Sequence, residues 1–95
     1  MNAQARLTLV NPKGLHARAS HKLVQTICEF ECQCQIHFGE RSADGRQIMS
    51  VMLLAAPVGS ELDFHCQGPQ ARACLDAITV LIADGLGELG ERTDP

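Results

Sequence analysis

The sequence contains no tryptophan, no tyrosine and only three phenylalanines among its 95 residues. A hydrophobic core must therefore be built mainly from aliphatic side chains, methionine and cysteine. Hydrophobic residues still make up 45% of the chain, which is enough for one core and too many for a disordered segment. We expect a single domain over residues 1–95, with its core in residues 4–87 and a flexible tail in 88–95.

The chain also has no excess of basic residues, because its eight Lys and Arg residues are outnumbered by eleven Asp and Glu residues. A mildly acidic chain without a basic run lacks the surface charge that binds nucleic acids or anionic membranes. No hydrophobic run approaches the roughly 20 residues of a membrane span, and the first ten residues lack the apolar stretch of a signal peptide. We therefore expect a monomeric, cytoplasmic protein that binds neither nucleic acid nor membrane.

Cysteine is plentiful, but its number is odd, whereas secreted disulfide frameworks have even sets. Each cysteine occupies a position that a small apolar residue would also fit, which indicates reduced and mostly buried thiols. A single residue separates Cys32 from Cys34, while structural zinc sites use pairs separated by two to four residues together with a second pair. We expect no metal and no cofactor. The five cysteines are Cys28, Cys32, Cys34, Cys66 and Cys74.

Apolar and polar residues alternate in three segments, which predicts half-buried strands at residues 4–10, 32–38 and 61–67. The polar stretch between the second and third of these segments predicts a turn and a short edge strand around residues 41–43. Strands with one polar face suit an antiparallel sheet with one face open to solvent.

A helical period replaces the alternation in residues 17–29 and again from Ala71 to Ile82. The segment 47–55 has the composition of a helix, but it is short and almost entirely apolar, so its periodicity alone does not decide its structure. The element order is β-α-β-β-α-β-α. This order predicts an α+β fold, an open-faced sandwich in which helices cover one face of an antiparallel sheet. The predicted inward face of the first helix consists of Ser20, Leu23, Val24, Ile27 and Cys28.

His16 stands where a turn ends and the first predicted helix begins. The first backbone N–H groups of a helix, here those of Ala17 and Arg18, have no intrahelical acceptor and form an anion site. Arg18 adds a cation whose donors suit phosphate oxygens. Positive surroundings disfavour an imidazolium, so we expect a neutral and nucleophilic ring. Such a site exposes a nucleophile and stabilises a phosphoryl group attached to it.

The segment Gly14-Leu15-His16-Ala17-Arg18 resembles the active-site motif Gly-Leu-His-x-Arg-Pro-Ala of the HPr/NPr family, the histidine phosphocarriers of the bacterial phosphotransferase system. Residues 46–52, Arg-Gln-Ile-Met-Ser-Val-Met, resemble the family's second motif, Lys-Ser-Ile-Met-Gly-Val-Met. The resemblance implies a four-stranded antiparallel sheet with three helices. It also implies that Nδ1 of His16 accepts a phosphoryl group from phosphorylated enzyme I and passes it to a histidine of an enzyme IIA domain, in a sugar or nitrogen-related system.

The same resemblance assigns phosphate stabilisation to Arg18 and partner docking to an apolar patch of Ile48, Met49 and Met52. His21, about one helical turn after Arg18, is a further candidate for docking. An alternative function is a regulatory interaction module of the same fold, in which phosphorylation of His16 switches partner binding.

Two positions depart from the family pattern. Ala19 replaces the proline that fixes the first helical turn, so we expect a less rigid helix start. Gln47 occupies the place of the regulatory serine of many Gram-positive relatives. Because glutamine cannot be phosphorylated, regulation by a serine kinase of the HPr type is not expected.

Overall fold

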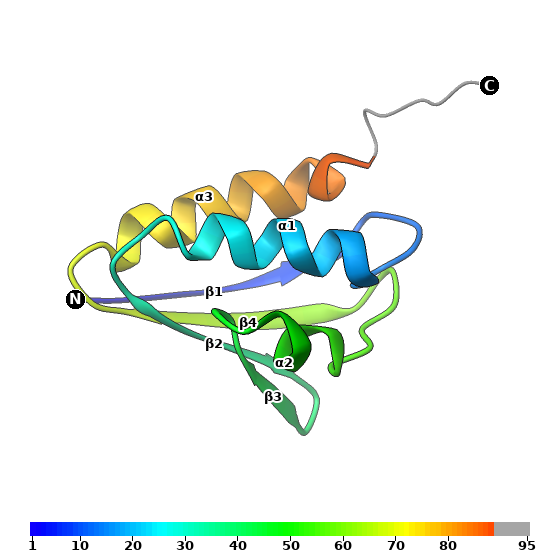
Figure 1. The fold of residues 1–95 in the computed structure, drawn as a ribbon, viewed down its shortest axis with the longest axis horizontal. Coiled ribbons are helices and arrows are strands. Elements are labelled where there is room, and N and C mark those ends of the chain that lie inside the picture. Colours follow the sequence, from blue (N-terminus) through cyan, green and yellow to red (C-terminus); the bar gives the residue numbers. More distant parts are fainter. Residues whose placement is uncertain (89–95) are drawn as a thin grey trace.

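The structure is a computed structural model that describes residues 1–88. The chain forms two βαβ units joined by a hairpin, and a long helix follows the second unit (Figure 1). No helix in residues 1–88 has the length and apolar character needed to cross a membrane. The elements are β1 (Asn2–Thr8), α1 (Ala17–Ile27), β2 (Gln33–Phe38), β3 (Arg41–Asp44), α2 (Ile48–Met52), β4 (Glu61–Gln67), α3 (Ala71–Ala83) and the 3-10 turn η1 (Gly85–Gly87).

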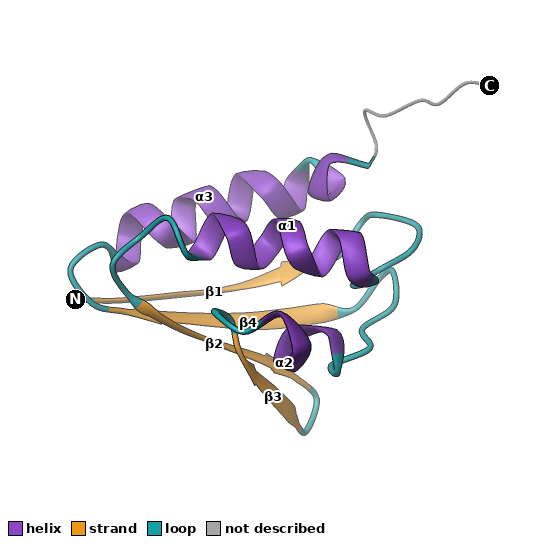
Figure 2. Cartoon of the chain, in the orientation of Figure 1, coloured by secondary structure: helices purple, strands orange, loops and turns teal. Residues whose placement is uncertain are grey.

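The four strands form one antiparallel sheet in the order β1-β4-β2-β3. The last strand therefore lies in the middle of the sheet, between the first and the second. Helices α1 and α3 lie side by side on one face, and the short helix α2 packs beside α1 and β3 (Figure 2). The predicted fold class, an open-faced sandwich with helices on one side, is confirmed.

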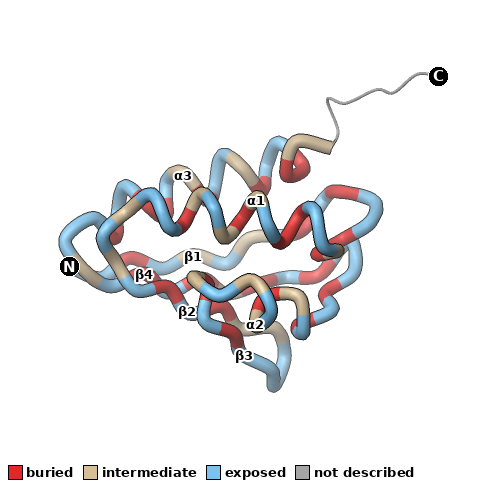
Figure 3. The backbone as a smooth tube through the Cα atoms, viewed as in Figure 1, coloured by how far each residue is buried: buried red, intermediate tan, exposed pale blue. Residues whose placement is uncertain are grey.

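The core lies between the sheet and the two long helices, and buried and exposed residues alternate along the strands (Figure 3). Phe64 on β4 is fully buried opposite Ile36 on β2 and Ala5 on β1. Burying a side chain of this size contributes about 1.5–3 kcal/mol, so this register is strongly favoured. The helices add the fully buried side chains of Leu23, Ile27 and Ile78. The opposite face of the sheet carries polar side chains, among them the exposed Gln33, Gln35 and His65.

Three elements differ from the sequence-based expectation by two or more residues at one or both ends. Strand β1 ends at Thr8, although Leu9 stays buried and its N–H bonds Ser60 O at 2.9 Å. The segment 47–55 forms only the five-residue helix α2, in which Val51 alone is buried. The prediction that Cys28 faces the core is wrong. Helix α1 ends at Ile27, and Cys28 caps it in an exposed position because the chain turns away there.

The turn before α1 packs against the segment that follows α2. Leu15 N donates to Ala56 O at 2.9 Å, and Gly14 has a φ of +62°. A Cβ atom at position 14 would overlap Ala56 O and come within 2.8 Å of Pro57 Cα. Glycine is therefore needed both for the left-handed backbone and for the close approach of the two segments.

Replacement of this glycine tests how tightly the turn is held. Gly14→Ala should lower the free energy of unfolding by more than about 2 kcal/mol, because backbone strain of about 1–2 kcal/mol adds to the overlap with Ala56. Gly39→Ala is the matched control, since Gly39 has a φ of +60° but a Cβ atom there would meet no heavy atom within 4 Å. Urea unfolding of both variants measures the difference. Equal losses would show that strain alone acts at Gly14 and that the close approach contributes nothing.

Candidate functional site

His16 occupies the N-cap position of α1, as its place in the sequence predicts. Its backbone is extended, with φ −76° and ψ −179°, and its carbonyl oxygen accepts the N–H of Ser20 at 2.9 Å. The side chain makes no capping hydrogen bond to the helix and is 29% exposed. The imidazole is thus fixed at the start of a helix while remaining accessible to a partner.

Two buried polar side chains hold the turn that carries His16. Asn11 Nδ2 donates to the carbonyl oxygen of Gly14 at 2.8 Å, and Ser20 Oγ donates to that of Leu15 at 3.1 Å. Both side chains are shielded from solvent, where an unsatisfied polar group would cost about 1–3 kcal/mol. These bonds therefore define the backbone directly before the imidazole.

Glu88 contributes a carboxylate to the site from the other end of the sequence. Its Oε2 is hydrogen-bonded to His16 Nε2, and its Oε1 accepts from Asn11 Nδ2 at 3.1 Å. The turn η1 makes this contact possible, because Leu86 is buried and its positive φ of 55° brings the chain back over the start of α1. The sequence-based expectation placed Glu88 in a flexible tail. No spacing signal could have paired residues 72 positions apart; residues 89–95 of that tail lie outside the described residues.

The contact with Glu88 decides which ring nitrogen is available. Burial raises the pKa of the Glu88 carboxyl, but the hydrogen bonds from Asn11 and His16 outweigh it, and the net pKa lies below its ordinary value. The group is therefore a carboxylate near neutral pH and accepts a hydrogen bond. In a neutral imidazole that hydrogen sits on Nε2, so we assign the free lone pair to Nδ1.

Arg18 and Ala17 lie in the first turn of α1, and both are exposed. The helix is 11 residues long, so its N-terminal N–H groups and macrodipole place positive charge at this end. The sequence-based expectation of a purely positive environment around His16 was incomplete. The ring lies between this positive helix start and the carboxylate of Glu88.

The predicted docking residues form an apolar surface on α2. Met49 is 64% exposed, and Ile48 and Met52 are half-buried. Leu53, which sequence reasoning missed, is 73% exposed directly after the helix. We call Ile48, Met49, Met52 and Leu53 the α2 patch. The hydrogen bond between Leu15 and Ala56 ties the segment that leads out of the patch to the turn before His16. His21 is exposed on α1, one turn beyond Arg18.

Comparison with known proteins agrees with this geometry. The family model described as "PTS HPr component phosphorylation site" matches residues 3–84. The chain belongs to the HPr family. It is an HPr-type component of the phosphotransferase system, as the two sequence motifs predicted.

Individual relatives cover nearly the whole chain. The phosphocarrier protein HPr of Cupriavidus necator is 41% identical over 85 residues, which span 90% of this chain and 96% of that protein. The phosphocarrier protein NPr of Shewanella violacea is 33% identical over 79 residues, spanning 83% and 87%. The crystal structure of HPr-C-His from Thermoanaerobacter tengcongensis superimposes with a TM-score of 0.87 at 26% identity, covering 90% of this chain and 97% of that one.

The lowered pKa of Glu88 predicts a pH-dependent contribution to stability. A carboxyl whose pKa is lowered by folding stabilises the protein above its ordinary pKa of 4.5, and this stabilisation is lost as the pH falls through the folded-state value. Glu88→Gln should therefore reduce the free energy of unfolding by about 1 kcal/mol at about pH 5, and by much less at about pH 3. Urea unfolding at both pH values measures the two differences.

Glu40→Gln serves as the control, because Glu40 is an exposed carboxylate in the turn between β2 and β3. Its replacement should leave the free energy of unfolding unchanged at either pH. A Glu88→Gln deficit that stays constant or grows toward low pH would contradict the assigned contact.

Proposed function

We propose that this protein accepts a phosphoryl group on Nδ1 of His16 from phosphorylated enzyme I and passes it to a histidine of an enzyme IIA domain. The observation that carries the proposal is the engagement of His16 Nε2 by Glu88 at the start of α1. This contact leaves Nδ1 with its lone pair on an accessible ring. Phosphoenolpyruvate, the primary phosphoryl source of the system, is a cytoplasmic metabolite, which supports the cytoplasm as the place of action and a monomeric shuttle as the working form.

In the accepting step, the lone pair of Nδ1 attacks the phosphorus of the donor's phosphohistidine. A phosphorus–nitrogen bond forms at His16, the corresponding bond in the donor breaks, and its electron pair returns to the donor imidazole. The ring of His16 gains positive charge during the attack. The carboxylate of Glu88 at Nε2 stabilises that charge and holds the ring in place.

Groups around His16 act on the phosphorylated form in opposite directions: the positive helix start stabilises it and the carboxylate of Glu88 destabilises it. The N–H groups of Ala17 and Arg18 at the helix start favour the new negative charge by roughly 0.3–1 kcal/mol, and the guanidinium of Arg18 adds charge-assisted hydrogen bonds. The carboxylate of Glu88 opposes this effect through like-charge repulsion. A carrier needs such a balance, because the phosphoryl group must survive diffusion and then leave.

The α2 patch supports a role in docking. Large exposed apolar side chains beside a reactive group indicate a protein-binding surface, and methionine adapts to several partners. Enzyme I and an enzyme IIA domain would each cover the patch while His16 meets their own active-site histidine. His21 extends this surface along α1.

Phosphorylation of His16 tests the proposed chemistry. Incubation with enzyme I, phosphoenolpyruvate and Mg²⁺ should add one phosphoryl group, seen by intact-mass spectrometry and lost on brief acid treatment, as expected for a phosphorus–nitrogen bond. The group should be absent from His16→Ala and present in the control His65→Ala, whose imidazole is exposed on the open sheet face. Full phosphorylation of His16→Ala would refute the assignment.

Charge introduced into the α2 patch tests docking separately from chemistry. Met49→Lys should raise the KM for transfer from enzyme I about tenfold, the effect of losing a contact worth about 1.4 kcal/mol, with little change in kcat. Val80→Lys is the matched control, because Val80 on α3 is 70% exposed and Met49 is 64% exposed. Steady-state transfer assays give both constants. Equal effects of the two variants would show that docking does not use the α2 patch.

The similarity to an NPr protein favours a second candidate function, a regulatory module whose partner binding is switched by phosphorylation of His16. Transfer of labelled phosphate to purified enzyme IIA domains of sugar and nitrogen-related systems separates the two. If the protein is a regulatory module, its His16→Ala variant should bind the main partner as tightly as the unphosphorylated wild type does. The phosphorylated wild type should then pass phosphate to neither domain.

A further inference from the structure

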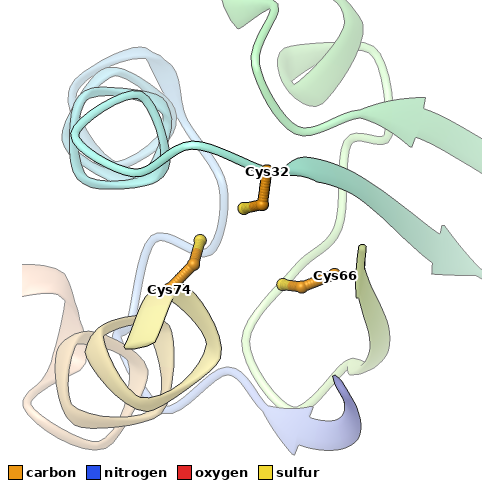
Figure 4. Close-up of side chains that lie close together, drawn as sticks. All are labelled: Cys32, Cys66 and Cys74. Carbon is orange, nitrogen blue, oxygen red and sulfur yellow. The ribbon is translucent and has the colours of Figure 1, made fainter. Parts of the chain in front are cut away.

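Three cysteines from separate segments of the chain come together at one end of the fold. The Sγ atoms of Cys32, Cys66 and Cys74 all lie within 4.8 Å of one another (Figure 4). They come from the segment before β2, from β4 and from the first turn of α3. Cys34 on β2 adds a further sulfur, 3.9 Å from that of Cys66.

This cluster is separate from the phosphorylation site. His16 precedes α1 and Cys32 follows it, so the 11 residues of the helix, about 16 Å at 1.5 Å each, lie between them. In Figure 1 the start of α1 and the start of α3 lie at opposite ends of the molecule. The proposed function makes no use of the cysteines.

We propose that Cys32, Cys66 and Cys74 form a binding site for a thiophilic metal ion, with Zn²⁺ as the ion that best fits its geometry and charge. Thiolates are the preferred protein ligands of such ions. Zinc–sulfur bonds of about 2.3 Å hold the sulfurs of a tetrahedral site about 3.8 Å apart. The three sulfurs need to approach one another by only about 1 Å to reach that spacing.

The elements that carry the ligands are already fixed against one another. Glu31 and Gln70 exchange two hydrogen bonds, of 2.7 Å and 3.1 Å, which join the segment before Cys32 to the start of α3. Gly68 lies so close to this segment that a Cβ atom there would come within 2.9 Å of Cys32 Cα. A site whose ligands are held in this way binds an ion with little loss of conformational entropy.

Binding of Zn²⁺ would displace the thiol protons of the three cysteines, so it releases protons to solvent.

Arg46 provides charge balance and an anchor at the same place. Its Nη1 donates to the carbonyl oxygens of Phe30 and Cys32 at 3.0 and 3.1 Å. Three thiolates and one Zn²⁺ leave a net charge of −1, which the guanidinium offsets. Cys32 is half-buried and borders a shallow surface depression that Arg46 and Gly68 also line. This depression gives an ion a route in and leaves the fourth coordination position to a water molecule.

The proposal departs from the expectation of no metal that the sequence supported. Cys32-Gln33-Cys34 has the wrong spacing for a zinc motif, and only one of its two cysteines belongs to the three-sulfur group. Cys66 and Cys74 join it through strand pairing and helix packing, which sequence spacing does not reveal. Cysteines that merely fill a core would not need a half-exposed member beside a surface depression.

Metal titration of the reduced, chelator-treated full-length protein tests the site. The wild type should bind one equivalent of Zn²⁺ in competition with a chromophoric chelator, and Co²⁺ should give the thiolate charge-transfer absorption of a tetrahedral sulfur site. Cys32→Ser should weaken binding of both ions at least tenfold and remove that absorption. Cys28→Ser is the matched control, because Cys28 is an exposed thiol outside the cluster, and it should bind both ions like the wild type.

Two further measurements do not depend on a variant that folds poorly. At a hundredfold excess over the dissociation constant, Zn²⁺ should raise the Tm of the wild type by roughly 10 °C, the shift expected when an ion binds only the folded state. In the wild type, Zn²⁺ should also protect Cys32 from alkylation while Cys28 still reacts, as mapped by peptide mass spectrometry. Equal affinity in Cys32→Ser and Cys28→Ser, absence of the cobalt–thiolate absorption, or unprotected Cys32 would each overturn the proposal.

An imidazole site is the main competitor for the same ions. His37 and His65 lie on the open sheet face with ring centroids 5.3 Å apart. His65→Gln should leave the affinity and the cobalt spectrum unchanged. Loss of binding in this variant, with thiolate absorption absent, would assign the ion to the histidines and refute the cysteine site.

Discussion

The hydrogen bond from Leu15 N to Ala56 O joins the two parts of the molecule on which the proposed phosphoryl transfer depends. The first is the turn that ends in His16, and the second is the segment leading out of the α2 patch. Gly14 permits the contact because it has no Cβ atom and adopts a positive φ. If this approach were looser, the imidazole and the docking surface could move independently, and a partner bound to one would not be positioned for the other.

In the proposed transfer, the charges around His16 would let one site both hold and release a phosphoryl group. The start of α1, whose first turn carries the cationic Arg18, attracts negative charge, whereas the carboxylate of Glu88 repels it and binds Nε2. A site with cations alone would stabilise the phosphorylated form more strongly and slow the transfer to an acceptor. In this proposal Glu88 also selects the reactive nitrogen, which the cations at the helix start cannot do.

Residue patterns in the sequence were sufficient for the parts of the structure that depend on local periodicity. Strand β4 has the predicted bounds, and the edge position of β3 and the place of His16 at a helix start agree with the sequence as well. The sequence predicts an end of α1 that is too late. The helical spacing of apolar residues continues to Cys28, but the backbone leaves the helix after Ile27.

Contacts between distant segments could not be predicted in the same way. Glu88 reaches His16 only because a positive φ at Leu86 turns the chain back, and leucine gives no signal of that conformation. The three-sulfur group depends on the pairing of β4 with β2 and on the packing of α3 against the sheet. The spacing of Cys32 and Cys34, on which the expectation of no metal was based, therefore does not bear on the three sulfurs that the structure brings together.

The two proposed sites lie at opposite ends of α1, and this separation has a physical consequence. Between the two ends, Leu23 and Ile27 anchor this helix in the close-packed core. An ion that draws Cys32 toward Cys66 and Cys74 would stiffen the far end of the sheet–helix interface without adding charge near His16. Its effect on phosphoryl transfer would then come through the stability of the fold, and the reactivity of the imidazole would remain set by Glu88 and the start of α1.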